Sequence, residues 1–202
     1  MEYLKKGLKI TVSMIIICGI MYPLLITGIG QLFFNYEANG SVMKVDGKEV
    51  GSELIGQNYT DEKYFNGRIS AVNYNISDNG KEIDSTSGSQ NLGPTSDVLK
   101  ERVNKMLNKD IENFLKKNPT VSKDEITEEL ISQSGSGLDP HITVRGAEIQ
   151  IDRISKATGI SKDKLKTLIE ENKEGKLLGL YGNERVNVLK LNIGVDELLK
   201  EK

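Results

Sequence analysis

An uncharged apolar segment near the amino terminus constrains this chain more than any other feature. Residues 10–34 read ITVSMIIICGIMYPLLITGIGQLFF and contain no charged side chain. A helix that crosses a bilayer needs roughly 20 consecutive apolar residues, whereas a helix on the surface of a globular domain keeps one polar face. The sequence therefore predicts a transmembrane helix over residues 10–34.

The charges that flank this segment predict its orientation. The nearest charged side chains are Lys5, Lys6 and Lys9 before it and Glu37 after it. Because basic residues stay on the cytoplasmic side, we expect residues 1–9 to form a cytoplasmic tail. Residues 35–202 are then expected to form an extracytoplasmic globular domain on a single-pass membrane protein with membrane lipid as one partner.

A cleaved signal peptide is the alternative to an uncleaved anchor. Its apolar region would span about 7–15 residues and end at a small-residue cleavage site. The segment here is longer, and the bulky residues 31–34 follow its last glycine. We therefore expect an anchor that is retained. Pro23 removes one helical hydrogen bond and predicts a kink within it.

Composition limits what the remaining chain can do. The sequence has 27 basic and 29 acidic residues, a net charge of −2, so it has no excess of basic residues for a nucleic-acid partner. The only cysteine, Cys18, lies in the apolar segment, so no intramolecular disulfide can stabilise the outer domain. A lysine-rich chain without disulfides is typical of a bacterial cell-membrane protein.

Hydrophobic periodicity predicts a mixed domain with more helix than strand. Asp46-Gly47 predicts a β-hairpin over residues 41–50. Alternation predicts a strand over residues 185–193. Helices are expected over residues 60–65, 94–117, 122–131, 142–158, 161–172 and 195–200. The predicted fold class is α+β, or α/β, with a small sheet and several helices on the single transmembrane helix.

Two loops rich in glycine and serine, residues 85–94 and 132–141, run directly into predicted helices. Backbone amides at a helix amino terminus can bind phosphate. A P-loop, however, requires Gly-Lys followed by Ser or Thr, and that triplet is absent from the sequence. The sequence of these two loops therefore favours structured turns or contact loops, with phosphate binding as the alternative.

The only histidine, His141, follows Asp139 at a distance of two residues. The pair could act as a general base, but no partner nucleophile is readable, and a loop hydrogen bond explains the pair equally simply. A zinc site needs three or four ligands and is not expected with one histidine and no free cysteine in the outer domain. We predict no catalytic residue and no metal ligand.

Six short motifs occur in an order that is more specific than any one of them. They are GSELIGQ at 51–57, YFNGR at 64–68, SGSQNLGPT at 87–95, SGSGLDPHI at 134–142, QIDR at 150–153 and VNVLKLN at 186–192. Together with the amino-terminal span, they make the chain resemble the C subunit of the Kdp potassium-transporting P-type ATPase. One departure is Ile69, where relatives often have proline.

The resemblance implies a non-catalytic accessory subunit of a high-affinity, ATP-driven potassium-uptake complex. Its partners would be a potassium-channel-like subunit, a P-type ATPase subunit and a small single-helix subunit. The family's C subunit is described as a catalytic chaperone that raises the ATP affinity of the ATPase subunit. The positions that match this role are Ser134, Gly135, Ser136, Gly137 and Gln150. No tightly bound cofactor is implied, and ATP would act through the complex.

The predicted topology favours a different role for the same region. The flanking charges place the domain outside the cell, whereas ATP is inside it, so the residues favour external docking or potassium access. The docking candidates are Asn91, Gly93, Asp139, His141 and Arg153. An independent anchored binding or sensor domain, or an anchored hydrolase that uses His141 and Asp139, are the alternatives to a subunit of a complex.

Overall fold

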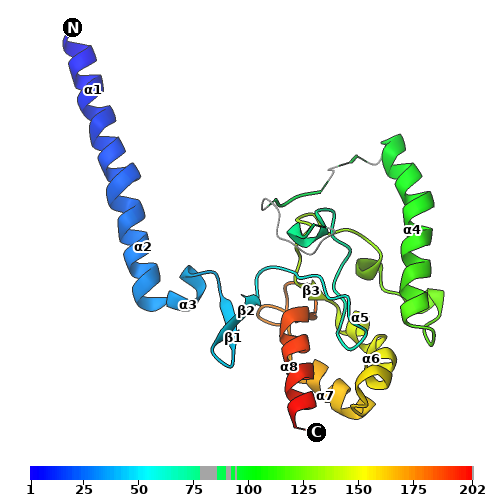
Figure 1. Ribbon diagram of the computed structural model, residues 1–202. Helices are drawn as coiled ribbons and strands as arrows, with labels where there is room; N and C mark the ends of the chain where they lie inside the picture. The colour runs from blue at the N-terminus through cyan, green and yellow to red at the C-terminus, as the bar shows by residue number, and fades with distance from the viewer. Residues whose placement is uncertain (78–85, 90–91, 94, 202) are drawn as a thin grey trace. The chain divides into compact units, whose positions relative to one another are not determined.

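The computed structural model describes residues 1–77, 86–89, 92–93 and 95–201, and describes the backbone but not the side chains of residues 102–107. The chain divides into two compact units, Met1–Ser52 and Glu53–Lys202. Figure 1 shows the elements of both units in chain order.

The first unit begins with one continuous helix (Figure 1). It consists of α1 (Glu2–Met14), the π-helical segment η1 (Ile15–Met21) and α2 (Tyr22–Phe33). Among the described residues, Glu2–Phe33 is the one helix that is long and apolar enough to cross a membrane. The predicted apolar helix is therefore present and starts eight residues earlier than residue 10. The hydrogen-bond pattern changes to π-helical directly before the turn that contains Pro23, which has no N–H to donate.

A short helix and a hairpin complete the first unit. Helix α3 (Asn35–Ala38) is followed by β1 (Val42–Val45) and β2 (Lys48–Ser52), which pair antiparallel. Asp46 and Gly47 have φ angles of 51° and 77°, as a tight hairpin turn requires. The hairpin predicted from this Asp-Gly pair is confirmed.

The second unit has a small antiparallel sheet whose strands lie in the order β3-β5-β4. The strands are β3 (His141–Ile142), β4 (Lys173–Glu174) and β5 (Arg185–Asn187). Four helices pack with this sheet and with one another: α5 (Val144–Glu148), α6 (Ile151–Thr158), α7 (Lys162–Glu171) and α8 (Val188–Lys200). Mixed helices and small sheets, with one apolar amino-terminal helix, agree with the predicted α+β class.

The core of the second unit joins residues that are far apart in the sequence. Phe65, Leu165 and Leu191 are fully buried, although about 126 residues separate the first from the last. Apolar burial of this kind is the main stabilising term in a domain without disulfides. The buried core cluster consists of Phe65, Leu130, Ile142, Ala147, Ile149, Ile151, Ile154, Ile160, Leu165, Leu168, Ile169, Val186, Val188, Leu191 and Val195.

The longest helix of the second unit is α4 (Asp97–Lys117), and its extent agrees with the prediction. The Ser96 side chain accepts a hydrogen bond from the backbone N–H of Leu99 at 3.4 Å and caps its start. Two 3₁₀ turns follow, η3 (Lys123–Glu125) and η4 (Glu128–Leu130), and a further one, η2 (Asn73–Asn75), precedes α4. The Ser122–Glu125 capping box is present, but it opens a 3₁₀ turn and not the helix predicted over residues 122–131.

The strand predicted over residues 185–193 is wrong beyond Asn187. The Asn187 side chain accepts a hydrogen bond from the backbone N–H of Lys190 at 3.2 Å, and α8 starts at the next residue. An asparagine cap satisfies a helix amino terminus well. The helix predicted over residues 195–200 is the second half of this longer helix.

Two predicted helices are also wrong in part. Residues 60–65 form a turn, because the backbone N–H of Phe65 bonds the Asn192 side chain at 2.7 Å and not a preceding carbonyl. The helix predicted over residues 142–158 is divided into β3, α5 and α6, with Gln150 at the break. The prediction over residues 161–172 is confirmed as α7. Gly159, predicted to cap the preceding helix, has a left-handed φ of 67°.

Candidate functional site

Gln150 lies at the start of α6 and is completely buried. Its Nε2 donates to the carbonyls of Gly146 at 3.0 Å and Asn66 at 3.1 Å. Its Oε1 accepts from the backbone N–H of Asn66 at 2.8 Å and from Arg153 at 2.8 Å. Because both ends of the amide have partners within the domain, Gln150 acts as an internal brace between α6 and residues 64–68.

Arg153, one turn further along α6, completes this brace. Its Nε donates to the Oδ1 of Asn118 at 3.0 Å, and its guanidinium also bonds the carbonyls of Tyr64, at 2.9 Å, and Glu62. Burial lowers the pKa of Arg153 to about 10, which leaves it charged at neutral pH. Arg153 therefore joins the end of α4 to residues 62–64 and is not available as an exposed docking contact in this structure.

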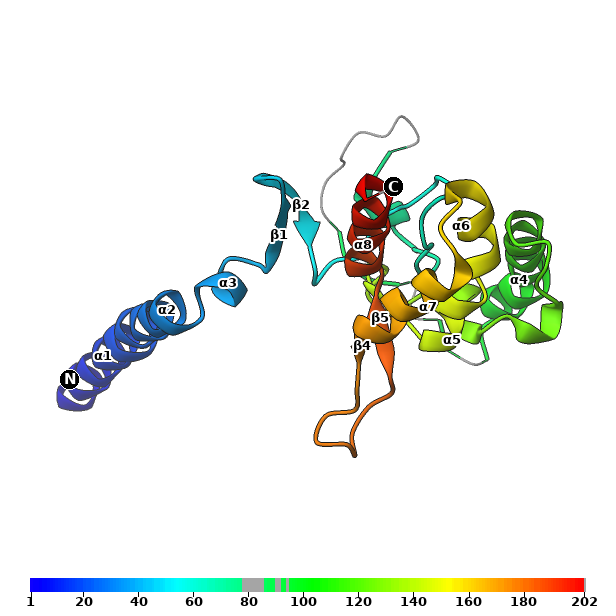
Figure 2. The ribbon, with the colours of Figure 1, turned by 90° about the horizontal axis from the view of Figure 1, so that it is seen from below.

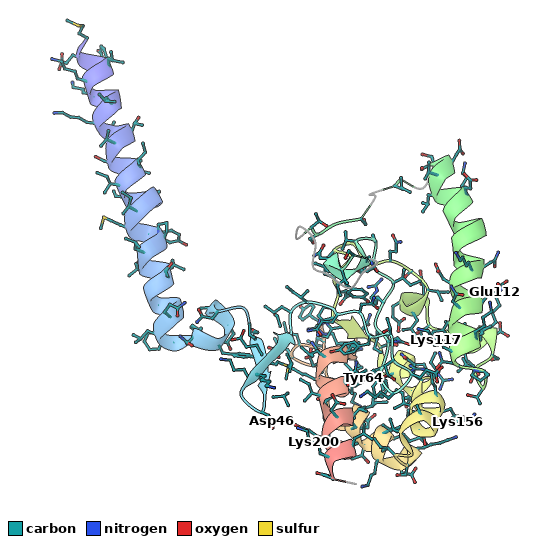
Figure 3. All side chains as sticks on the ribbon, in the orientation of Figure 1. Asp46, Tyr64, Glu112, Lys117, Lys156 and Lys200 are labelled. Carbon is teal, nitrogen blue, oxygen red and sulfur yellow. The ribbon has the colours of Figure 1, made fainter. Side chains whose placement is uncertain are left out.

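The aromatic residue beside this brace faces α8. Tyr64, labelled in Figure 3, donates from its hydroxyl to the Asp196 carboxylate at 2.9 Å. Its ring contacts the ring of Tyr59 edge to face, with centroids 5.3 Å apart. Gln150, Arg153 and Tyr64 thus hold the YFNGR motif against three separate elements.

The two glycine-serine loops of the sequence lie against each other. The backbone N–H of Gly88 donates to the carbonyl of Ser136 at 2.7 Å, and the Ser87 hydroxyl donates to the same carbonyl at 3.2 Å. Ser70 donates to the carbonyl of Gly137 at 2.6 Å. Gly137 has a left-handed φ of 72°. These contacts use the loop backbone internally, so the loop is built as a structured turn.

The remaining small residues of these loops have simpler environments. Ser134 is buried, and its hydroxyl has no hydrogen-bond partner among the described residues. Gly135 is exposed. Gly93 accepts a hydrogen bond from Ser96 at 3.0 Å where the chain enters α4. Asn91, a predicted docking residue, lies outside the described residues.

Asp139 is the centre of a polar cluster that the sequence predicted only as a pair. Its Oδ2 lies 2.9 Å from the Arg68 guanidinium, and its Oδ1 accepts from the backbone N–H of His141 at 3.0 Å. The His141 side chain, its backbone N–H and Arg68 lower the pKa of Asp139 from 3.8 to about 2, against the opposing effect of burial. Asp139 is therefore ionised throughout the physiological range.

His141 lies between two carboxylates. Its Nδ1 is 3.6 Å from Asp139 and its Nε2 is 3.5 Å from Glu174 on β4. Glu174 also pairs with Arg185 at 3.0 Å and with Lys190 at 3.6 Å. Within the described residues, no group of three or more His, Cys, Asp or Glu side chains could hold a metal ion. The cluster is arranged to join β3, β4 and β5 electrostatically.

A cleft of about 290 Å³ with a mixed polar and apolar lining lies between α4 and residues 57–74. Lys117, labelled in Figure 3 at the carboxyl end of α4, is one of its lining residues. Burial, with a smaller contribution from Asp139, raises the pKa of Tyr74 in this cleft to about 12. The lining is otherwise rich in amide side chains, including Gln57, Asn58, Asn66, Asn73 and Asn113. None of the site residues predicted from sequence lines this cleft.

Sequence reasoning missed the most exposed apolar group of the second unit. The connection from β4 to β5 carries residues 177–181, Leu-Leu-Gly-Leu-Tyr, which we call the apolar tip. Their exposed fractions are 71% for Leu177, 82% for Leu178, 76% for Leu180 and 67% for Tyr181. The sequence feature that could have predicted this exposed group is a short apolar run between Gly175 and Gly182. The same pattern is typical of a buried strand, so it does not distinguish the two.

Comparison with known proteins covers nearly the whole chain. Residues 4–197 match the family model described as KdpC, K⁺-transporting ATPase, c chain. The potassium-transporting ATPase KdpC subunit of Clostridioides difficile is 45% identical over 98% of this chain and 99% of its own length. Its counterpart in Clostridium kluyveri is 45% identical over 95% of this chain and 92% of its own length. That of Caldanaerobacter subterraneus is 43% identical, over 99% and 97% respectively. The chain therefore belongs to the KdpC family, the c chains of K⁺-transporting ATPases.

Proposed function

We propose that this chain is a non-catalytic accessory subunit that assembles with, and stabilises, an ATP-driven potassium-uptake complex. The observation that carries the proposal is the family match over residues 4–197 together with relatives that align from end to end. The polar groups that could suggest an enzyme, such as His141 and Asp139, have partners inside the domain. Its partners would be the channel-like, P-type ATPase and single-helix subunits that the resemblance implies.

The same proposal includes a topology. Residues 10–34 cross the membrane, residues 1–9 face the cytoplasm, and residues 35–202 lie outside. The basic side chains before the apolar segment support this orientation, since they are retained on the cytoplasmic side.

The family resemblance implies that this chain raises the ATP affinity of the ATPase subunit. The proposal includes this effect only as an indirect one, without contact between this chain and ATP. Gln150 is completely buried, and its amide contacts Gly146, Asn66 and Arg153. A side chain with these contacts supports the shape of the domain. Any rise in the ATP affinity of the ATPase subunit would then be transmitted through assembly of the complex, without nucleotide contact at Gln150.

Co-purification tests the assembly role. The full chain is expressed with the other subunits of the complex, and the ATPase subunit carries the affinity tag. We expect stoichiometric recovery of the chain and loss of potassium-stimulated ATP hydrolysis when it is omitted. A chain that never travels with the ATPase subunit, yet shows a ligand-dependent thermal shift, would be a sensor domain instead.

Cysteine labelling tests the topology. Lys48 is exposed on the hairpin, so Lys48→Cys in a Cys18→Ala background gives one accessible thiol. We expect this thiol to react with a membrane-impermeant maleimide in intact cells. Reaction only after permeabilisation would reverse the orientation and place the domain on the side of ATP.

A further inference from the structure

The apolar tip, residues 177–181, projects from the second unit. Figure 2 shows the connection between β4 and β5 extending away from the helices of that unit. Every residue from Gly175 to Arg185 is exposed, whereas the next residue, Val186, is completely buried. The tip is thus a protrusion with four large apolar side chains in water, and it makes no contribution to the core cluster.

The tip has a defined shape. Leu177 and Tyr181 exchange backbone hydrogen bonds of 2.8 and 3.0 Å, and Gly179 and Leu180 donate to the carbonyls of Lys176 and Leu177. Leu178 has a φ of 53°, a left-handed conformation that costs an L-residue other than glycine. These four hydrogen bonds pair part of the backbone polar groups of the tip within the turn, which lowers the cost of burying the tip in an apolar environment.

We propose that the apolar tip inserts into an apolar pocket on another subunit of the potassium-transporting complex. This inference rests on the proposed function, because it names the element through which the accessory subunit docks. A group of exposed apolar side chains rimmed by charged residues is typical of a protein interaction site, which has an apolar centre and a polar rim. Lys176, Glu184 and Arg185 supply that rim here.

The shape of the tip favours a different protein over a second copy of this chain. A two-fold dimer brings the same surface of both copies together, and two protrusions do not fit into each other. A stable interface also buries roughly 800 Å² on each partner, which four side chains on one turn cannot supply alone. The tip therefore needs a concave receptor and serves as the anchor of a larger contact.

The charges near the tip favour protein over lipid. Loops and helices that bind membrane surfaces combine apolar side chains with a cluster of lysine and arginine. Here acidic and basic residues are mixed, and the two basic residues nearest the strands are neutralised locally. Lys173 pairs with Glu170 at 2.8 Å and Arg185 pairs with Glu174 at 3.0 Å.

A retention assay tests the anchor. The full chain carrying Leu180→Asp and Tyr181→Ser is co-expressed with the other subunits and purified in detergent through the ATPase subunit. We expect the ratio of this chain to the ATPase subunit after extended washing to fall at least about tenfold, as for loss of interface hot spots. Val98→Asp is the matched control, since Val98 on α4 is also 58% exposed, and it should retain wild-type recovery.

Photo-crosslinking identifies the occupant without disrupting the tip. Leu180 is replaced by p-benzoylphenylalanine, and the complex is reconstituted in phosphatidylcholine–phosphatidylglycerol vesicles and irradiated. We expect an adduct with another subunit of the complex that is absent when the same amino acid replaces Val98. An adduct with lipid alone, an adduct with a second copy of this chain, or undiminished retention of the double variant would each overturn the proposal. A wild-type chain that fails to co-purify would overturn the proposed function itself.

Discussion

The loop over residues 134–141 and the apolar tip over residues 177–181 are both short, glycine-bearing turns, yet they are built in opposite ways. The first is dense in family motifs, and its polar groups bond Ser70, Arg68 and Gly88 within the domain. The second has backbone hydrogen bonds within its own turn and presents leucine and tyrosine to water. A loop rich in recognisable polar residues is therefore not the more available surface.

The physical reason lies in the different needs of polar and apolar groups. A buried polar group is stabilised by a hydrogen-bond partner, and Asp139 and the backbone of the first loop are bonded to Arg68, Ser70 and Gly88 within the domain. Exposed apolar side chains form no hydrogen bonds with water. A group of them on the surface therefore indicates an interaction surface. The following variants test whether residues 134–141 stabilise the fold and whether residues 177–181 serve mainly as a contact surface.

Arg153→Ala should have the largest effect on stability, because it breaks the brace behind the motif loop. The change removes the donor to the carbonyl of Tyr64 and to the amide oxygen of Asn118, and one of the two donors to the amide oxygen of Gln150. We expect a loss of about 3–5 kcal/mol in the free energy of unfolding. Urea unfolding of the full chain in detergent, followed by circular dichroism, measures it.

Arg145→Ala is the control for that variant. Arg145 is half exposed and pairs with Glu125 at 3.1 Å, so its loss should cost less than about 1 kcal/mol. Equal effects of the two arginine variants would show that the Gln150–Arg153 brace does not stabilise the domain.

Gly137→Val should have the next largest effect. Gly137 has a φ of 72°, and a Cβ there would lie 3.0 Å from Val72 Cγ2 and 3.1 Å from the carbonyl oxygen of Gly88. Backbone strain of this kind costs on the order of 1–3 kcal/mol before any overlap is added. Gly175→Val, next to the apolar tip, has open space and an ordinary φ, so it should unfold at nearly the wild-type urea concentration. The comparison between the loops fails if the two valine variants unfold together.

Asp139→Asn should have an effect that depends on pH. The folded pKa of about 2 lies below the ordinary 3.8, so ionised Asp139 stabilises the domain at neutral pH. This contribution is present above 3.8 and is lost as the pH falls toward 2. The difference in urea midpoint between wild type and Asp139→Asn should therefore shrink with acidification. A difference that stays constant would exclude the Arg68–Asp139–His141 cluster as a source of stability.

Leu178→Gly should have the smallest effect on stability and the opposite sign. Glycine relieves the left-handed φ of 53°, and the gain slightly exceeds the entropy that glycine loses on folding. We expect a stability equal to wild type or about 0.5 kcal/mol higher, with weaker retention in the complex. Thermal unfolding and the washing assay measure the two quantities on one preparation. A variant that is both less stable and fully retained would show that Leu178 belongs to the fold and not to the docking surface.

The sequence by itself determined the elements whose signals are local. The uncharged run over residues 10–34 needs no partner to form a helix, because its backbone groups bond within the segment. Asp46-Gly47 specified its hairpin, Ser96 and Ser161 started α4 and α7, and Gly159 ended α6. The order of six motifs was enough to indicate the family.

Tertiary structure decided the places where a side chain replaced a backbone partner. Asn192 captures the backbone of Phe65 and prevents a helix, and Gln150 bonds Asn66 where α5 and α6 separate. The Asn187 amide, which caps α8 locally, also donates to the carbonyl of Glu53 at 2.7 Å, 134 residues away in the sequence. Gln150 lies 84 residues from Asn66 in the sequence, and Asn192 lies 127 residues from Phe65. A local sequence pattern therefore cannot predict these contacts.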